Sequence, residues 1–131
     1  MYSRKDTPRA VYRLSQNQRI NTSSSLAEKF PKLKTLRVDL DYFDPAGLTR
    51  NGGMKCRFNL EHAKSVFYFY CPNGECVGGD FDLTEPLARA VAGRLKAVTG
   101  EMRCNGVRHN KQRKEPLPCQ SLLRYKLSLG Y

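Results

Sequence analysis

Residues 71–76 read Cys71-Pro72-Asn73-Gly74-Glu75-Cys76, and this stretch decides how the rest of the chain is interpreted. Proline starts a turn here, and Asn-Gly accepts the left-handed conformations that curl a backbone around an ion. Zinc prefers a tetrahedron of thiolates, and the four residues between the two cysteines fall within the usual ligand spacing. The turn therefore predicts one half of a structural Zn²⁺ site.

Two single cysteines later in the chain supply the other half of this site. Cys104 ends an expected strand just before the tight turn Asn105-Gly106, and Cys119 begins the last strand. Strand and turn ends are where metal ligands converge. His109 and Cys56 remain alternates for the fourth position, ranked below Cys119. Reduced cysteines buried as small apolar side chains, or a redox dithiol, are the competing interpretations.

The turn from Cys71 to Cys76 resembles one knuckle of the zinc ribbons and related cysteine knuckles. The likeness covers little more than these residues, because the repeated short spacing that defines those families is missing. The resemblance therefore implies a metal-binding turn and no particular family.

The charge balance indicates the kind of partner. The chain has 131 residues, with 23 Lys+Arg against 12 Asp+Glu, and a formal charge of +11. The positive electrostatic field of such a chain attracts polyanions, above all nucleic acid, and also anionic membranes or acidic protein surfaces. The sequence shows no long apolar run and no hydrophobic stretch after its first residues, so we expect a cytoplasmic protein whose cysteines stay reduced.

The chain divides into a polar part, residues 1–33, and a domain, residues 34–131. The first part is basic, which predicts a flexible N-terminal arm. A short helix over Leu26–Phe30, capped by Ser24 or Ser25 and closed by a proline, is an equal alternative.

The domain reads as strands around one helix. Strict alternation over Leu36–Tyr42 predicts a half-buried strand, and a hairpin of Met54–Leu60 with Ser65–Cys71 follows, joined by residues 61–64.

Thr84 is expected to cap the main helix, whose apolar stripe consists of Leu87, Val91, Leu95 and Val98. A short strand over residues 101–104 and a final strand over 123–131 complete the order. We therefore predict an α+β fold: an antiparallel sheet of about five strands with one main helix packed on it, stapled by zinc.

The hairpin register would give its two faces different chemistry. One face carries Cys56, Phe58, Leu60, Ser65, Phe67 and Phe69, and the other carries Lys55, Arg57, Asn59, Val66, Tyr68 and Tyr70. Tyrosines flanked by basic side chains offer stacking surfaces for nucleic-acid bases.

A basic loop bracketed by the last two cysteines is the other functional lead, because clustered cations hold phosphates without reading sequence. The predicted nucleic-acid-binding residues are Arg57, Tyr68, Tyr70, Arg103, Arg108, Lys111, Arg113, Lys114, Arg124 and Lys126.

The sequence gives little support for catalysis. His62 and His109 lie beside no serine or cysteine in a nucleophile turn. The pairs Asp39 with Asp41 and Asp80 with Asp82 suggest a metal-dependent nuclease only as a third interpretation, and we assign no catalytic residue.

The first expectation for the function is a small regulatory zinc protein that binds DNA, RNA or a ribonucleoprotein. The second is an interaction module that docks on an acidic partner, such as the transcription machinery.

Overall fold

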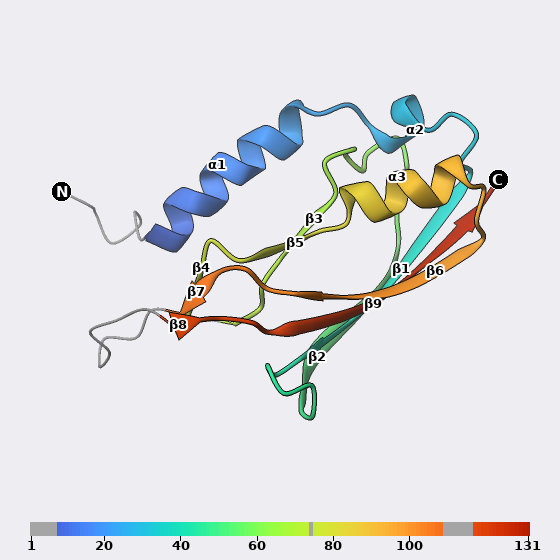
Figure 1. Ribbon diagram of the computed structural model, residues 1–131. Helices are drawn as coiled ribbons and strands as arrows, with labels where there is room; N and C mark the ends of the chain where they lie inside the picture. Colours follow the sequence, from blue (N-terminus) through green and yellow to red (C-terminus); the bar gives the residue numbers. More distant parts are fainter. Residues whose placement is uncertain (1–7, 74, 109–116) are drawn as a thin grey trace.

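The fold combines a four-stranded antiparallel sheet with two smaller sheets and helices (Figure 1). The structure is a computed structural model and describes residues 8–73, 75–108 and 117–131. The predicted α+β class with antiparallel pairing is confirmed, but the strands form three sheets where we expected one of about five strands. The large sheet has the order β2 (Arg50–Arg57), β1 (Thr35–Phe43), β9 (Leu122–Gly130) and β6 (Ala97–Arg103).

The core lies on one face of the large sheet, which we call the inner face. Alternate residues of β1 and β9, among them Val38 and Leu127, are fully buried. Leu26 of α2 (Leu26–Lys29) and Leu87 of α3 (Thr84–Ala92) join the same cluster, so these helices cover the inner face. Each buried leucine contributes roughly 2 kcal/mol of transfer free energy. The opposite, outer face carries the polar residues of the alternation.

The first 33 residues contain helices in place of the expected arm. Ser25 caps α2 by accepting a hydrogen bond from the Glu28 amide, which confirms the short-helix alternative. The longer helix α1 (Pro8–Thr22) was not predicted. It lies along β3 (Tyr68–Tyr70) and β5 (Asp80–Asp82), which form a two-stranded sheet. The flexible-arm prediction is therefore wrong for residues 8–22, and residues 1–7 lie outside the described part.

Polar and cation–π contacts attach α1 to this small sheet. Arg13 Cζ lies 4.7 Å from the ring centroid of Tyr70, and Arg19 Cζ lies 5.1 Å from that of Tyr68. Arg19 also donates to the Tyr68 hydroxyl at 2.6 Å. The Tyr12 hydroxyl donates to the Asp80 carboxylate, and burial, together with this hydrogen bond, raises the pKa of Tyr12. The two tyrosines predicted to stack on bases therefore lie under α1.

We expect Tyr70→Leu to loosen α1 and leave the large sheet intact. The variant removes the contact with Arg13, worth about 0.5–1 kcal/mol. It also removes the hydrogen bond of 2.5 Å from the Tyr70 hydroxyl to Asn17 Oδ1, worth about 1 kcal/mol. Hydrogen exchange of the α1 amides should accelerate about tenfold, while the exchange rates in β1 and β9 stay unchanged.

Tyr131→Leu is the matched control for this experiment. Arg94 Cζ lies 5.6 Å from the Tyr131 ring centroid, and the Tyr131 hydroxyl donates to the Leu95 carbonyl at 3.0 Å. This tyrosine makes the same two kinds of contact at the end of α3. If both variants change exchange in α1 equally, Tyr70 does not hold the helix.

The predicted hairpin between residues 54–60 and 65–71 is wrong. β2 pairs with β1, through a tight turn in which Asp44 Oδ1 accepts from the Leu48 and Thr49 amides. Residues 61–64 do not fold β3 back on β2, because backbone carbonyls at Leu60 and Ala63 accept hydrogen bonds from the start of α2. Three aromatic rings of the predicted face still pack edge to face, with centroids 5.1–6.1 Å apart: Phe58, Phe67 and Phe69.

The main helix is shorter than its apolar stripe predicts. α3 ends at Ala92 before Gly93, Leu95 is 48% exposed, and Val98 belongs to β6. The N-cap is Leu83 and not Thr84. The Thr84 hydroxyl accepts instead from the Phe67 amide at 2.8 Å, which ties the helix start to the chain before β3.

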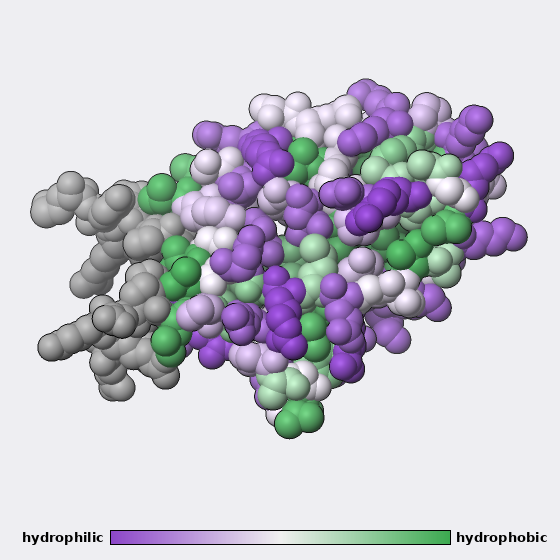
Figure 2. All heavy atoms as spheres, viewed as in Figure 1, coloured by the Kyte–Doolittle hydropathy of each residue, from purple (hydrophilic) through white to green (hydrophobic). Residues whose placement is uncertain are grey.

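The surface seen in Figure 2 is largely hydrophilic, with hydrophobic atoms in separate patches. One patch lies at the tip of the β1–β2 hairpin, at the bottom of the view, where Leu48 is 85% exposed. Within the described residues, no helix has the length and apolar character that crossing a membrane requires.

Candidate metal centre

Four cysteine sulfurs converge at one end of the large sheet. The Sγ atoms of the group lie within 4.8 Å of one another, and their residues are all buried: Cys71, Cys76, Cys104 and Cys119. None of these cysteines is in a disulfide. The prediction that these four cysteines come together is confirmed.

The geometry of the group fits a tetrahedral metal ion. Cys71 and Cys119 have their sulfurs 3.8 Å apart, and the sulfurs of Cys76 and Cys104 are 3.5 Å apart. A zinc ion bonded to sulfur at about 2.3 Å sets sulfurs about 3.8 Å apart in a regular tetrahedron. The donor set is all sulfur, which suits zinc or other thiophilic ions and not Mg²⁺ or Ca²⁺. Four buried ligands would complete a tetrahedron around such an ion and leave no open position for a substrate.

The first pair of cysteines is held by a closed turn. Cys71 follows β3 directly, and Cys76 begins β4 (Cys76–Val77). The Cys76 amide donates to the Asn73 carbonyl at 3.1 Å, and Asn73 Oδ1 accepts from the Glu75 amide at 2.9 Å. These bonds connect Asn73, Glu75 and Cys76 within the turn. Gly74, at which the sequence predicts a left-handed conformation, lies outside the described residues.

The second pair is positioned by strands β6 and β9. Cys104 follows β6, and Cys119 lies between β8 (Leu117–Pro118) and β9. The Cys104 amide donates to the Ser121 carbonyl at 2.8 Å, and the Cys119 amide donates to the Gly106 carbonyl at 2.9 Å. A small sheet of β4, β7 (Val107–Arg108) and β8 joins the two pairs. A bound ion would therefore cross-link segments that are distant in the sequence.

Two glycines line the sulfurs. A Cβ added to Gly79 would lie 2.3 Å from the sulfurs of both Cys76 and Cys104. A Cβ added to Gly106 would lie 2.6 Å from the Cys76 sulfur and 2.5 Å from the Gly79 Cα. The Gly106 amide also donates to the Cys104 sulfur at 3.4 Å. From the sequence, Gly106 is predicted only as part of a turn and Gly79 has no predicted role, although the pair Gly78-Gly79 so soon after Cys76 is a usable signal.

The thiols share protons unequally. The pKa of Cys71 is lowered to about 5, first because the Cys104 thiol hydrogen-bonds to it. Burial raises the pKa of Cys76 to about 12, and the hydrogen bond to Cys71 raises the pKa of Cys104. One thiolate is thus stabilised by protonated neighbours. A metal ion would have to displace the remaining protons, so its binding would release protons to solvent.

Neither alternate ligand belongs to the described cluster. Cys56 lies on β2 opposite Val38, and its thiol donates to the Arg57 carbonyl at 3.3 Å. His109 lies outside the described residues, as do Lys111, Arg113 and Lys114 of the basic loop. The structure therefore does not describe most of the loop in which the sequence placed nucleic-acid binding.

The outer face of the large sheet brings together cations from three of its strands, β2, β1 and β9. Its side chains form rows across the strands, which we number from the end of the sheet at which Thr35 lies. From β2 to β6, the first row is Arg57, Arg37, Ser128 and Ala97; the second is Lys55, Asp39, Lys126 and Thr99; the third is Gly53, Asp41, Arg124 and Glu101.

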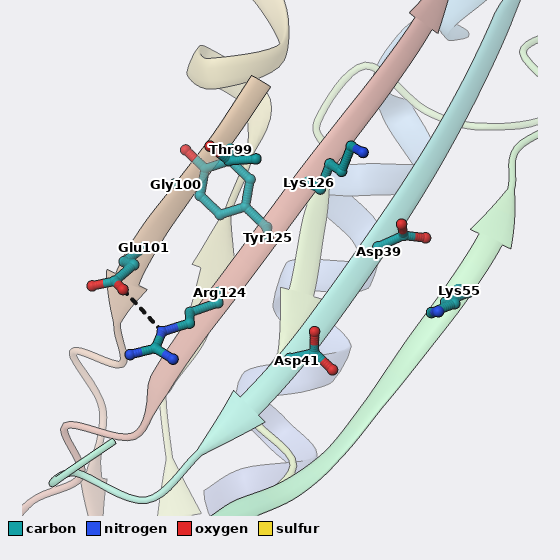
Figure 3. Close-up of a pocket in the computed structure, with 9 residues that line it drawn as sticks. All are labelled: Asp39, Asp41, Lys55, Thr99, Gly100, Glu101, Arg124, Tyr125 and Lys126. Carbon is teal, nitrogen blue, oxygen red and sulfur yellow. Dashed lines mark hydrogen bonds and ion pairs between the residues drawn. The ribbon is translucent and has the colours of Figure 1, made fainter. Parts of the chain in front are cut away.

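A hollow of about 420 Å³ lies over the second and third rows, with the helices behind the sheet (Figure 3). Its carboxylates are ion-paired. Arg37 Nε lies 3.3 Å from Asp39, Arg50 Nε lies 2.9 Å from Asp41, and Arg124 Nε lies 2.9 Å from Glu101. Within the described residues, Lys55, Arg57 and Lys126 form no ion pair, so this face carries uncompensated positive charge.

The other predicted binding residues have different positions. Arg103 donates to the carbonyls of Pro45 and Gln120, so its guanidinium holds two turns together. Arg108 lies on β7 opposite Cys76, half-buried beside the metal centre. Arg37 lies on the same face but was not among the predicted binding residues, since its neighbours across the sheet depend on strand pairing.

Comparison with known proteins adds no assignment. No protein-family model matches the chain. Neither the curated proteins nor the solved structures gave a match. The functional interpretation therefore rests on the four cysteines and the outer face.

Proposed function

We propose that this chain is a small zinc-binding protein that binds nucleic acid through the outer face of its large sheet. The observation that carries the proposal is the group of unpaired cations Lys55, Arg57 and Lys126 on an exposed sheet. Cations spread over such a surface neutralise several phosphates at once and release their counterions. The overall charge of +11 supports the same partner.

The proposed role of zinc is structural. The all-sulfur, buried donor set supports zinc and supports a stabilising ion without part in chemistry. β6 and β9 both run into the metal centre and both carry the outer face, so the ion would hold the binding strands in register. Cysteines outside disulfides suit a reducing compartment, which makes the cytoplasm the proposed location.

The proposal predicts retention on nucleic acid that weakens steeply with salt. The variant Lys55→Gln/Arg57→Gln/Lys126→Gln should bind a duplex DNA or a single-stranded RNA more weakly. The slope of log K against log[salt] on duplex DNA should become shallower by about 0.9 for each lost phosphate contact. Fluorescence anisotropy of a labelled oligonucleotide over a series of salt concentrations measures both quantities.

Lys29→Gln/Lys32→Gln/Arg89→Gln is the matched control, since it removes the same charge from α2, α3 and the segment after α2. These residues are exposed and lie away from the outer face. Equal weakening by both triple variants would mean that only total charge matters and that the outer face is not the site.

Absence of oligonucleotide retention at low salt would contradict the proposal and favour the second candidate, docking of the same face on an acidic protein.

A nuclease activity has less support. The carboxylates of Asp39, Asp41 and Glu101 already pair with arginines. Within the described residues, only the cysteines form a group that could hold a metal.

A further inference from the structure

Two arginines face each other at the most basic end of the outer face. Arg37 of β1 and Arg57 of β2 are direct cross-strand partners, and both are exposed. A hollow of about 170 Å³ is lined by both arginines together with Thr35, Leu36, Ser128 and Leu129. Two arginines and two hydroxyl-bearing residues thus share one small cavity with two leucines.

The charges at this end are unbalanced. Like charges directly opposite each other on neighbouring strands destabilise a sheet. Arg37 has one acidic partner, since its Nε lies 3.3 Å from Asp39. Arg57 is in no ion pair within the described residues. The number of acids falls along the face, from two in the third row to one in the second and none in the row that contains these arginines. An anion between the two arginines would remove the repulsion.

The hydroxyl groups flank the arginines. Ser128 of β9 is the cross-strand partner of Arg37 on the side away from Arg57. Thr35 lies two residues before Arg37 on β1. Its Oγ1 lies beside Gly130, so that a Cβ added to Gly130 would lie 2.2 Å from this oxygen. Guanidiniums offer paired N–H donors that match two oxygens of a phosphate, and hydroxyls can donate to a third. The hollow therefore provides donors from three strands.

We propose that Arg37, Arg57, Thr35 and Ser128 form a binding site for one phosphate group. This inference rests on the proposed function and deepens it, because it names the place where a backbone phosphate is held. The same chemistry would accept a phosphodiester of a nucleic acid or the terminal phosphate of a free nucleotide. The remaining cations, Lys55 and Lys126, lie in the next row, where the following stretch of a bound strand would pass.

Inorganic phosphate is the first probe, followed by a nucleoside monophosphate and a short oligonucleotide. In NMR titrations of the full-length chain, phosphate should shift the Nε–Hε signals of Arg37 and Arg57 and the amide signal of Ser128. Arg57→Gln should weaken phosphate binding about tenfold, because it removes a charge-assisted contact. Arg57→Lys should be intermediate, since it keeps the charge and loses the paired donors. Lys29→Gln should leave phosphate binding unchanged.

The outcomes separate this inference from the proposed function. If phosphate shifts these signals and no oligonucleotide is retained, the phosphate site stands and nucleic-acid binding fails. If oligonucleotides bind while phosphate leaves these signals unchanged, the site is refuted and nucleic-acid binding stands. Ser128→Ala changes no charge and serves as the second variant. Unchanged phosphate affinity in both Arg57→Gln and Ser128→Ala would overturn the assignment.

Discussion

Replacement of Cys71 by serine should abolish zinc binding and unfold most of the protein. The Cys71 sulfur lies 3.8 Å from that of Cys119, and the residue itself is 1% exposed, so serine leaves a gap in a buried tetrahedron. Structural zinc contributes about 10–16 kcal/mol in small zinc domains. That is as large as the entire stability of a typical domain, about 5–15 kcal/mol. Elemental analysis should find about one zinc per wild-type chain, and circular dichroism should report unfolding of the variant.

Cys56→Ser is the matched control for the metal centre. Cys56 is also a cysteine on a strand, but it belongs to β2, outside the cluster. The control variant should keep its zinc and its melting temperature within a few degrees of wild type. A wild-type protein that is folded and free of metal, or a Cys71→Ser variant with a full zinc content, would refute the structural role of the ion.

The strands at the centre of the large sheet were predictable because their signal is local. β1 and β9 alternate between buried and exposed residues, and one face of each is in the core. Burial of Leu36, Leu40 and Leu129 needs only that alternation and a partner of the same kind. The sequence therefore predicted the two strands and their buried faces, whereas their pairing with each other is known only from the structure.

Errors arose where the partner is distant or the contact is polar. β3 reads as half of a local hairpin, yet it pairs with β5 because the segment before it is bonded to α2. α1 has few apolar residues and is held by tyrosine and aspartate side chains of the β3–β5 sheet. The spacing of apolar residues within the helix cannot indicate such contacts. The end of α3 was misplaced because Leu95 and Val98 continue its apolar spacing across Gly93.

The candidate site divides in the same way. The four cysteines indicate a metal centre by their residue type and their positions at turn ends, and this signal does not depend on which strands pair. The outer face cannot be recognised so early, because Arg37, Arg57 and Ser128 become neighbours only through the order β2-β1-β9. Sequence therefore identified the four cysteines that cluster, but only part of the surface that we propose binds nucleic acid.

The glycines around the sulfurs test whether the cysteines converge on an ion. Gly79→Ala would place a methyl group 2.3 Å from two sulfurs, far below van der Waals contact. Without a metal, the Cys76 and Cys104 thiols can turn away from the methyl group at modest cost. With a metal, they cannot turn away without breaking the tetrahedron. We therefore expect Gly79→Ala to lower zinc affinity by about 100-fold, the upper range for residues that support metal ligands.

Gly106→Ala should act in the same direction, because its methyl group would meet the Cys76 sulfur at 2.6 Å and the backbone of Gly79. Gly93→Ala is the control: its nearest contact is 3.5 Å and its φ is −85°, which alanine adopts without strain. Competition with a chromogenic chelator measures the three zinc affinities. Wild-type affinity in Gly79→Ala would mean that the sulfurs do not close around an ion. A parallel loss of zinc and of oligonucleotide binding would link the metal centre to the register of the outer face, because β6 and β9 form part of both.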